Sequence, residues 1–312
     1  MSYAPIVLFT YSRADHTCDV VESLLKNKEA AESDLYIFSD GPKTEAKREA
    51  VEENRKYIHS ITGFKSIHIV EREKNWGLAN SLIAGITDVI NRYGRVIVVE
   101  DDLILSSYFL QYMNEALEKY EGEDKIGAIS AYHPIQDVDL PETFFLRYFH
   151  CWGWATWKRA WELFNPDARD LLRRIRWKTK KFNIDGGRNN YGMLYCQKVG
   201  LVDSWYIRLY ASLFLAEKLT LYPKQSLASN HGLDGTGTHS KDASKDNKNI
   251  DAKITAFDKP IKLSDIPVEE CSFAYQALHE TFVRSLPYAP LWKKKYYQFK
   301  SFLRRLLLID SM

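Results

Sequence analysis

The amino-acid sequence predicts an α/β protein whose core is a three-layer α/β/α sheet with a nucleotide-binding edge. Short β-branched runs alternate with segments of helical periodicity as far as about residue 133, an order typical of parallel strands joined by crossover helices. The run at residues 96–99 leads directly into Glu100, Asp101 and Asp102. Because unpaired carboxylates are costly to bury, we expect these three at the carboxyl edge of the sheet, where such folds bind ligands.

Each element of this first region follows from a local pattern. Strands are predicted where apolar, β-branched runs of four or five residues occur, at 6–9, 35–38, 67–70, 96–99 and 127–131. Helices are predicted with Asp15 as an N-cap, over the charged segment 43–57, from Leu78 and from about Ser107. The third of these helices is expected to bury Leu78, Leu82, Ile86 and Val89.

From residue 144 onward, the pattern changes to aromatic-rich irregular segments and helices. Asp203 is suited to cap a helix that buries Ile207, Tyr210, Leu213 and Phe214. Residues 229–249 are polar and lack periodicity, which predicts a long mobile loop. We therefore divide the chain into a nucleotide-binding region (1–133), a second region (134–250) and a C-terminal helical segment (251–312).

The last segment has a distinct composition, because residues 288–309 hold six basic side chains and no acidic one. The apolar residues that fall on one helical face of this segment are Trp292, Tyr296, Phe299, Leu303 and Leu306. A basic amphipathic helix suits an anionic membrane surface. The alternative is a terminal helix that packs on the protein body and keeps its cations in water.

Composition narrows the class of protein further. The chain has 312 residues, 45% hydrophobic and 27% charged, and its net charge of +2 gives no indication of a nucleic-acid partner. No stretch of 18 apolar residues predicts a membrane span, and residues 1–5 lack the pattern of a secretory signal. The four cysteines are widely spaced, which favours free thiols in a reducing compartment. We expect a cytoplasmic protein, either soluble or peripheral on the inner face of the membrane.

The acidic triplet suggests phosphate chemistry assisted by a divalent metal. Hard carboxylate oxygens suit Mn²⁺ or Mg²⁺, which are held by one or two carboxylates together with substrate phosphates. The alternative is a solvated acidic loop after a strand. The sequence contains no GxxxxGK[ST] loop, no GxGxxG after its first strand and no protein-kinase signature, which excludes those nucleotide-binding classes.

Four segments, in order, resemble GT-A fold glycosyltransferases. They are residues 6–13 (IVLFTYSR), 39–41 (SDG), 75–78 (NWGL) and 98–103 (VVEDDL). The Glu-Asp-Asp-Leu form is similar to inverting enzymes of the N-acetylglucosaminyltransferase I type and to bacterial transferases of surface polysaccharides, and the likeness covers roughly residues 4–240. It implies a metal-dependent inverting transfer from a nucleotide sugar, with a UDP-sugar favoured, to a saccharide or lipid-linked saccharide acceptor.

The resemblance also implies a role for each matching residue. Asp102 would be the metal ligand, Asp40 would accept hydrogen bonds from the base, and Trp154 would lie beside the donor sugar. Asp203 lies where inverting members keep their catalytic base, in the region 134–250 that would face the acceptor. The residues implied to bind the nucleotide sugar are Thr10, Tyr11, Arg13, Asp40, Asn75, Gly77, Glu100, Asp101, Trp154 and His231.

Each assignment has a simpler alternative. Asp203 also suits a helix cap, Asp40 an Asx turn and Trp154 the core, and histidines of polar loops such as His231 usually bind nothing. Against this, a carboxylate near the attacking sugar hydroxyl is what direct inversion needs, because the hydroxyl is a poor nucleophile until its proton is accepted. Two other functions remain open: a retaining transferase or nucleotidyltransferase on the same fold, and a non-catalytic protein that binds carbohydrate or membrane.

Overall fold

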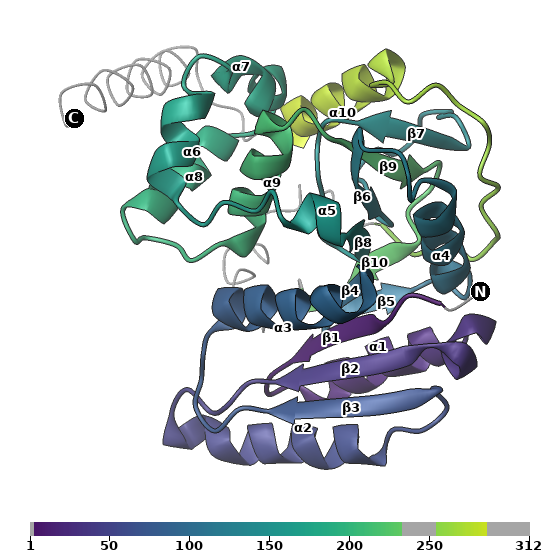
Figure 1. The fold of residues 1–312 in the computed structure, drawn as a ribbon, viewed down its shortest axis with the longest axis vertical. Coiled ribbons are helices and arrows are strands. Elements are labelled where there is room, and N and C mark those ends of the chain that lie inside the picture. Colours follow the sequence, from purple (N-terminus) through teal and green to yellow (C-terminus); the bar gives the residue numbers. More distant parts are fainter. Residues whose placement is uncertain (1–2, 233–253, 286–312) are drawn as a thin grey trace.

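The computed structural model describes residues 3–232 and 254–285 (Figure 1). The amphipathic helix predicted at 288–309 and residues 233–249 of the loop predicted at 229–249 lie outside these residues. In the described part of the chain, no helix is both long enough and apolar enough to cross a membrane.

The first region alternates strand and helix as the sequence predicts, and each predicted strand has a counterpart within one or two residues. The elements of this region are β1 (Ile6–Thr10), α1 (Ala14–Leu25), β2 (Asp34–Ser39), α2 (Arg48–Ser60), β3 (Ser66–Glu71), α3 (Leu78–Tyr93), β4 (Arg95–Glu100), β5 (Leu103–Leu105), α4 (Phe109–Lys119) and β6 (Ile126–Ser130). The short strand β5 was not predicted, and α4 begins two residues later than expected. The sequence periodicity therefore locates this half of the fold well.

The second region contains strands where the sequence predicted irregular segments and helices. Its elements are β7 (Thr143–Leu146), β8 (Trp154–Trp157), α5 (Lys158–Trp161), α6 (Ala168–Ile175), α7 (Thr179–Phe182), α8 (Asn190–Lys198), α9 (Trp205–Leu215), β9 (Leu219–Pro223) and β10 (Ala228–Asn230). Helix α10 (Ser272–Ser285) follows in the C-terminal segment. Strands β7, β8 and β9 have four or five residues each and are rich in aromatic side chains, so the sequence pattern is too short to distinguish a strand from a buried loop.

One sheet of eight strands joins both regions, in the order β3-β2-β1-β4-β8-β6-β9-β7. The four strands from β3 to β4 are parallel, as predicted. Strand β8 then inserts between β4 and β6 and runs antiparallel to both. The sheet is therefore mixed, and it crosses the boundary predicted at residue 133.

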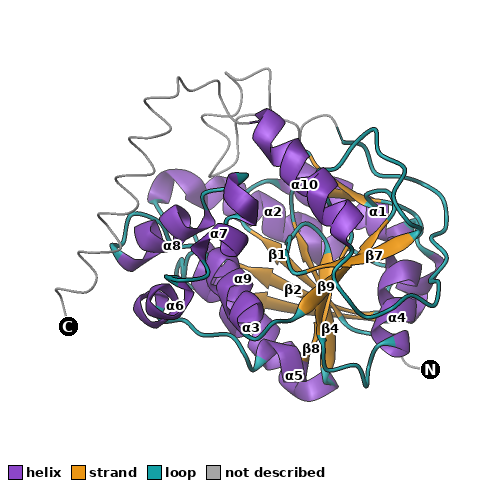
Figure 2. Ribbon diagram, turned by 90° about the horizontal axis from the view of Figure 1, so that it is seen from above, coloured by secondary structure: helices purple, strands orange, loops and turns teal. Residues whose placement is uncertain are grey.

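Helices cover both faces of the sheet, which confirms the three-layer architecture (Figure 2). Alternate residues of β1 belong to different cores: Val7 and Phe9 pack in the cluster that contains α3 and α9, whereas Ile6 and Leu8 pack in the cluster with α1 and α4. This two-sided burial explains why the strands of the first region appear as continuous apolar runs in the sequence.

A second, two-stranded sheet lies beside the first. Strand β10 pairs antiparallel with β5, so Asn230 lies opposite Leu103. The sequence had assigned residues 229 and 230 to a mobile loop, and this is wrong, because backbone pairing with β5 orders them. The pairing connects the end of β4 with a segment more than a hundred residues further along the chain.

Three local predictions at helix termini are wrong. Arg13, not Asp15, is the N-cap residue of α1, and Asp15 lies in its first turn. Ser204, not Asp203, caps α9, since its side chain accepts the hydrogen bond of the Ile207 N–H. Leu78 begins α3 but is exposed rather than buried. Each error concerns the first residues of a helix, and sequence patterns locate helix termini poorly.

Candidate active site

The carboxylates at the end of β4 lie beside a cation supplied by the end of β1. Parallel pairing of these strands brings Arg13 to the aspartates, so that its Nη2 lies 2.5 Å from Asp101 Oδ1 and 3.6 Å from Asp102 Oδ2. Asp101 is buried, whereas 24% of the Asp102 side chain is exposed. Of the two aspartates, Asp102 is therefore the one that a ligand can reach from solvent.

Negative charge at this edge is only partly neutralised. Burial, reinforced by the charges of Asp102 and Asp101, raises the pKa of Glu100 to about 8. Burial also raises the pKa of Asp101 to about 6, although the Arg13 guanidinium opposes the shift. Both carboxyl groups are thus hard to ionise by themselves, and a cation bound at this edge would favour their charged forms.

The ligand set at this edge suits a metal that is bound together with phosphate. Within residues 3–232 and 254–285, no three His, Cys, Asp or Glu side chains are grouped so as to hold a metal ion. Asp102 supplies partly exposed hard oxygen atoms, and Mg²⁺-type sites take their other ligands from water and substrate phosphates. The side chains present therefore fit Mn²⁺ or Mg²⁺ bound with a diphosphate, with Asp102 as the protein ligand.

Strand β10 brings a distant segment to the same edge. The His231 N–H donates to the backbone carbonyl oxygen of Asp102 at 2.8 Å. The next residue, Gly232, packs so closely that a Cβ there would lie 2.6 Å from Asp102 Oδ2. The resemblance implied that His231 binds the nucleotide sugar, and the structure brings its backbone to Asp102; binding by the His231 side chain stays a prediction.

Asp40, at the end of β2, holds the turn that begins α3. Its carboxylate accepts hydrogen bonds from the backbone N–H groups of Trp76 at 2.9 Å and Gly77 at 3.0 Å. Gly77 has a φ of +77°, a conformation that favours glycine. These contacts give Asp40 a structural role that differs from both alternatives considered from the sequence, the Asx turn and the contact with the nucleotide base. Binding of the nucleotide base by Asp40 stays a prediction.

The turns after β2 and β3 lie in direct backbone contact. A Cβ on Gly41 would lie 2.6 Å from the backbone carbon of Lys74, so no larger residue fits without moving the turn. The Asn75 side-chain amide donates to the Gly41 carbonyl oxygen at 2.8 Å. Asn75 and Gly41 thus fix the two turns against one another, which supports the position of Asp40.

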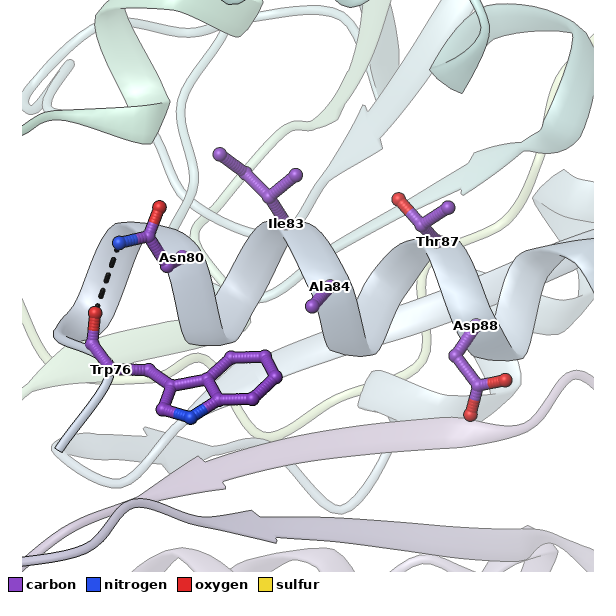
Figure 3. A pocket seen from close by; sticks show the side chains of 6 residues that line it. All are labelled: Trp76, Asn80, Ile83, Ala84, Thr87 and Asp88. Atoms are coloured by element: carbon purple, nitrogen blue, oxygen red, sulfur yellow. Dashed lines mark hydrogen bonds between the residues drawn. The ribbon is translucent and has the colours of Figure 1, made fainter. Parts of the chain in front are cut away.

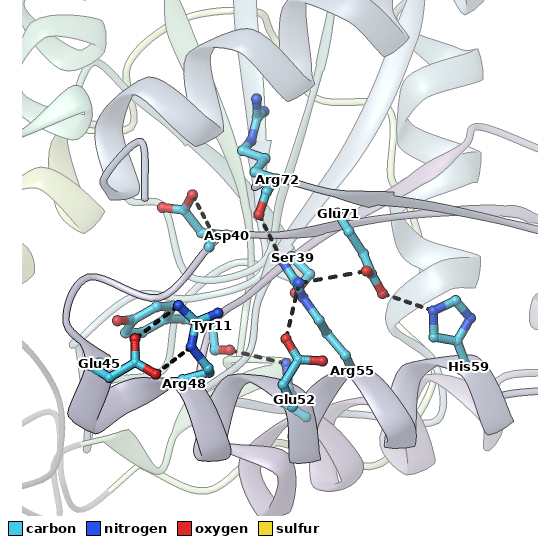
Figure 4. Close-up of polar contacts among 12 residues, drawn as sticks. Tyr11, Ser39, Asp40, Glu45, Arg48, Glu52, Arg55, His59, Glu71 and Arg72 are labelled. Atoms are coloured by element: carbon cyan, nitrogen blue, oxygen red, sulfur yellow. Dashed lines mark hydrogen bonds and ion pairs between the residues drawn. The ribbon is translucent and has the colours of Figure 1, made fainter. Parts of the chain in front are cut away.

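Arg72 and Trp76 extend this arrangement. Sequence reasoning assigned no role to Arg72 and considered Trp76 only as part of the segment 75–78. The Arg72 guanidinium carbon lies 3.6 Å from the centre of the Trp76 ring, a cation–π contact. Arg55 of α2 in turn donates to the Arg72 carbonyl oxygen at 2.8 Å (Figure 4). The two residues are only four positions apart, but their contact depends on the conformation of the loop between β3 and α3, which the sequence pattern does not specify.

An open depression of about 720 Å³ begins at Trp76 and follows the outer face of α3 (Figure 3). Trp76 is 49% exposed, so its indole offers an aromatic face to this depression. The other lining residues are Asn80, Ile83, Ala84, Thr87 and Asp88. None of the acidic residues of β4 lines it, so the depression extends from the sheet edge rather than forming the acidic site itself.

The residues after β1 are held by contacts within the protein. The buried Thr10 hydroxyl accepts a hydrogen bond from the Asn54 side-chain amide at 3.1 Å. The Tyr11 hydroxyl accepts one from the Lys43 N–H at 2.9 Å. Both residues lie at the carboxyl end of β1, as expected, and their contact with a nucleotide stays a prediction.

Trp154 lies in the core, and its predicted place in the sugar pocket is wrong. Its side chain is 1% exposed and stacks on Trp205, with ring centroids 5.7 Å apart. Gly153 has a φ of +65°, which breaks strand alternation, so the partly exposed Trp152 packs with Tyr132 on the other face of the sheet. The expected core positions of Trp157 and Trp161 are confirmed.

Asp203 is exposed and paired with a cation. Its side chain is 58% exposed, and Oδ1 accepts a hydrogen bond from Arg208 Nη2 at 2.9 Å. Because Ser204 caps the helix, the Asp203 carboxylate is not used as the cap. Arg208 itself is nearly buried and also donates to the Ser204 carbonyl oxygen, so it holds the carboxylate in one orientation.

Comparison with known proteins identifies the family. A family model described as the GNT-I family matches residues 1–170 of the 312. The chain belongs to the GNT-I family. This confirms the resemblance seen in the four sequence segments, and the mixed sheet with its acidic edge is a GT-A fold. No match was found among curated proteins.

Solved structures show more distant likenesses. The mannosyltransferase PcManGT of Pyrobaculum calidifontis, in complex with GDP-Man and Mn²⁺, is 17% identical with a TM-score of 0.35 over 56% of this chain and 47% of its own. Residues 1–349 of S. aureus TarS are 9% identical with a TM-score of 0.43 over 74% of this chain and 61% of their own. This GNT-I family chain thus matches only about half of the first protein and three-fifths of the second.

Proposed function

We propose that the chain is a metal-dependent inverting glycosyltransferase that moves a sugar from a nucleotide-sugar donor to a saccharide acceptor. A UDP-sugar is the favoured donor. The observation that carries the proposal is the acidic edge: Asp102 is partly exposed at the end of β4, with Arg13 and the His231–Gly232 backbone beside it. Membership of the GNT-I family supports the same chemistry.

The charged groups at this edge suit a nucleoside diphosphate. A bound Mn²⁺ or Mg²⁺ would neutralise negative charge on the departing diphosphate. Asp102 would hold that ion, while Asp101 holds the guanidinium of Arg13. Arg13 Nη1 is buried and has no hydrogen-bond partner within the described structure, so it can donate to a phosphate oxygen.

Asp203 is proposed as the base that accepts the proton of the attacking acceptor hydroxyl. Its exposure permits approach of an acceptor, and the Arg208 contact orients the carboxylate. Proton acceptance by a positioned carboxylate contributes about 10²–10⁴-fold to such reactions. Asp203 precedes α9, whose first residue Trp205 stacks on Trp154 of β8, and β8 pairs with β4.

The proposed setting is the synthesis of bacterial surface polysaccharide or a related glycan. There the acceptor is a growing saccharide, in one form linked to lipid, and the enzyme works at the inner face of the cell membrane. The basic segment 288–309 supports this part of the proposal. No nucleic-acid partner is proposed.

Calorimetry with nucleoside diphosphates tests the proposal directly. We expect UDP to bind in the presence of Mn²⁺ and to bind much more weakly when the metal is chelated. A thermal-shift screen of UDP-, GDP-, CMP- and dTDP-sugars with Mn²⁺ would then identify the donor. Absence of binding by every nucleotide, with and without metal, would reject the proposal and favour a non-catalytic role.

The stereochemistry of the product separates the two classes of transferase. NMR of the glycoside formed should show an anomeric configuration opposite to that of the donor. A retained configuration would replace inversion by a double displacement or front-face mechanism and remove Asp203 from the proposed base role. Formation of a nucleotide sugar from a sugar phosphate would instead show a nucleotidyltransferase.

A further inference from the structure

Residues 169–181, which include most of α6, all but the last residue of α7 and the turn between them, form a strongly basic surface, called here the basic end. Its thirteen residues contain seven cations and one carboxylate, a net charge of +6. The whole chain carries +2, which leaves −4 for all other residues. Within the described residues positive charge is therefore concentrated here; residues 288–309, outside them, carry a further +6 in the sequence. The cations are Arg169, Arg173, Arg174, Arg176, Lys178, Lys180 and Lys181.

Packing of α6 directs these cations outward. The helix buries Leu171, Leu172 and Ile175 in the core cluster that also contains α8 and α9. Asp170 is the carboxylate within the segment, and it is shared between Arg173 at 2.6 Å and Arg174 at 3.6 Å. Two carboxylates from outside the segment add contacts, Asp185 to Lys181 at 3.1 Å and Glu217 to Lys178 at 3.9 Å. Three carboxylates against seven cations leave the segment with an excess of positive charge.

An exposed tryptophan lies in the middle of this charge. Trp177, in the turn between α6 and α7, is 77% exposed, the largest value among the exposed apolar side chains of the described chain. The guanidinium of its neighbour Arg176 lies 5.2 Å from the indole centroid. Tryptophan flanked by Lys and Arg is typical of surfaces that enter the headgroup region of a bilayer, where the indole is half apolar and half hydrogen-bonded.

We propose that the basic end docks on an anionic lipid bilayer, with the cations at the lipid phosphates and Trp177 inserted among the headgroups. Charge complementarity selects a polyanionic surface, and the exposed indole selects a bilayer over a soluble polyanion. The surface lies at the opposite end of the long axis from α2 and β3 (Figure 1). Docking there leaves the first four strands away from the membrane.

This placement has a consequence for the acceptor, which rests on the proposed function. Helices α6 and α8 pack on α9, and Asp203 lies two residues before α9. Docking of the basic end would therefore place the membrane against the group of helices that packs on α9, the helix that Asp203 precedes. An acceptor saccharide attached to lipid would approach from that side.

Vesicle co-sedimentation of the full chain tests the docking surface without requiring turnover. We would use vesicles of 30% phosphatidylserine in phosphatidylcholine, with pure phosphatidylcholine as the neutral reference. Each cation at such a surface contributes about fivefold to binding, so the triple variant Arg173→Gln, Arg174→Gln, Lys180→Gln should bind about 100-fold more weakly. The matched control Lys28→Gln, Arg48→Gln, Lys65→Gln removes the same charge from exposed positions of the first region and should bind like the wild type.

The tryptophan separates a bilayer from other polyanions. Trp177→Ala should weaken vesicle binding several-fold and leave binding to heparin unchanged, whereas Phe273→Ala, an exposed aromatic of α10, should affect neither. Absence of wild-type binding to the anionic vesicles, equal losses in the two triple variants, or undiminished binding by the basic-end variant would each overturn the proposal. Undiminished binding would assign the membrane contact to segment 288–309 instead. UDP binding with Mn²⁺, measured on the same variants, keeps failure of docking distinguishable from failure of the proposed function.

Discussion

Asp40 provides a sharp test, because the sequence and the structure give it different roles. Its carboxylate accepts backbone hydrogen bonds from Trp76, Gly77 and Gly41, all at about 3 Å. In Asp40→Asn, one oxygen is replaced by an NH₂ group that faces N–H donors and cannot accept from them. Loss of one hydrogen bond to a charged acceptor costs about 1.5–3 kcal/mol, so we expect the free energy of unfolding to fall by about 2 kcal/mol.

Urea denaturation, followed by circular dichroism, measures this free energy, and calorimetry measures UDP affinity on the same samples. If Asp40 anchors the turn, stability falls with the asparagine variant and falls further with Asp40→Ala, which leaves several backbone N–H groups without an acceptor. Asn54→Ala, which removes another buried polar side chain near β1, serves as a control for general loosening. Unchanged stability combined with lost UDP affinity would refute the anchoring role and favour a hydrogen bond between Asp40 and the nucleotide base.

Three further predictions concern the acidic edge, the base and a buried histidine. Asp102→Asn should abolish the metal dependence of UDP binding in calorimetry and keep a normal thermal melt; near-normal metal dependence would reject it as the ligand. Asp203→Asn should lower kcat with little change in donor affinity, and a change confined to donor binding would remove it from the base role. His133 donates from Nε2 to the Pro223 carbonyl oxygen, and burial lowers its pKa to about 4 from 6.5. Because folding favours the neutral imidazole, the stability that His133 contributes is present above pH 6.5 and is lost as the pH falls towards 4. At pH 5 the free energy of unfolding should be lower by about 2 kcal/mol. Urea titrations should show a smaller loss between pH 7 and pH 5 in His133→Gln, and an equal loss would contradict this prediction.

The sequence predicted the first half of the fold closely because its signals are local. Three of the four parallel strands, β1, β2 and β4, are short runs buried on both faces, and the helices between the strands repeat apolar residues on one side. The second half was predicted less well. Strands β7 and β8 have four residues each and depend on partners far away in the chain, so no window of sequence contains the cause of their formation.

The candidate site shows the same division. Glu100, Asp101 and Asp102 follow a strand, and their position at the sheet edge could be predicted from that alone. Trp154 could not be placed, because the φ of +65° at Gly153 sends the tryptophans on either side of it to opposite faces of the sheet.

The sequence by itself determined which residues form strands and helices in the first region, and that carboxylates end β4. These properties depend on side chains within a few positions of one another, so they are written in consecutive residues. Only the tertiary structure decided that Arg13 pairs with Asp101, that His231 meets Asp102 and that Asp40 holds the turn at Trp76. Those contacts join residues tens to more than a hundred positions apart, and they form because sheet pairing and core burial bring distant backbone together.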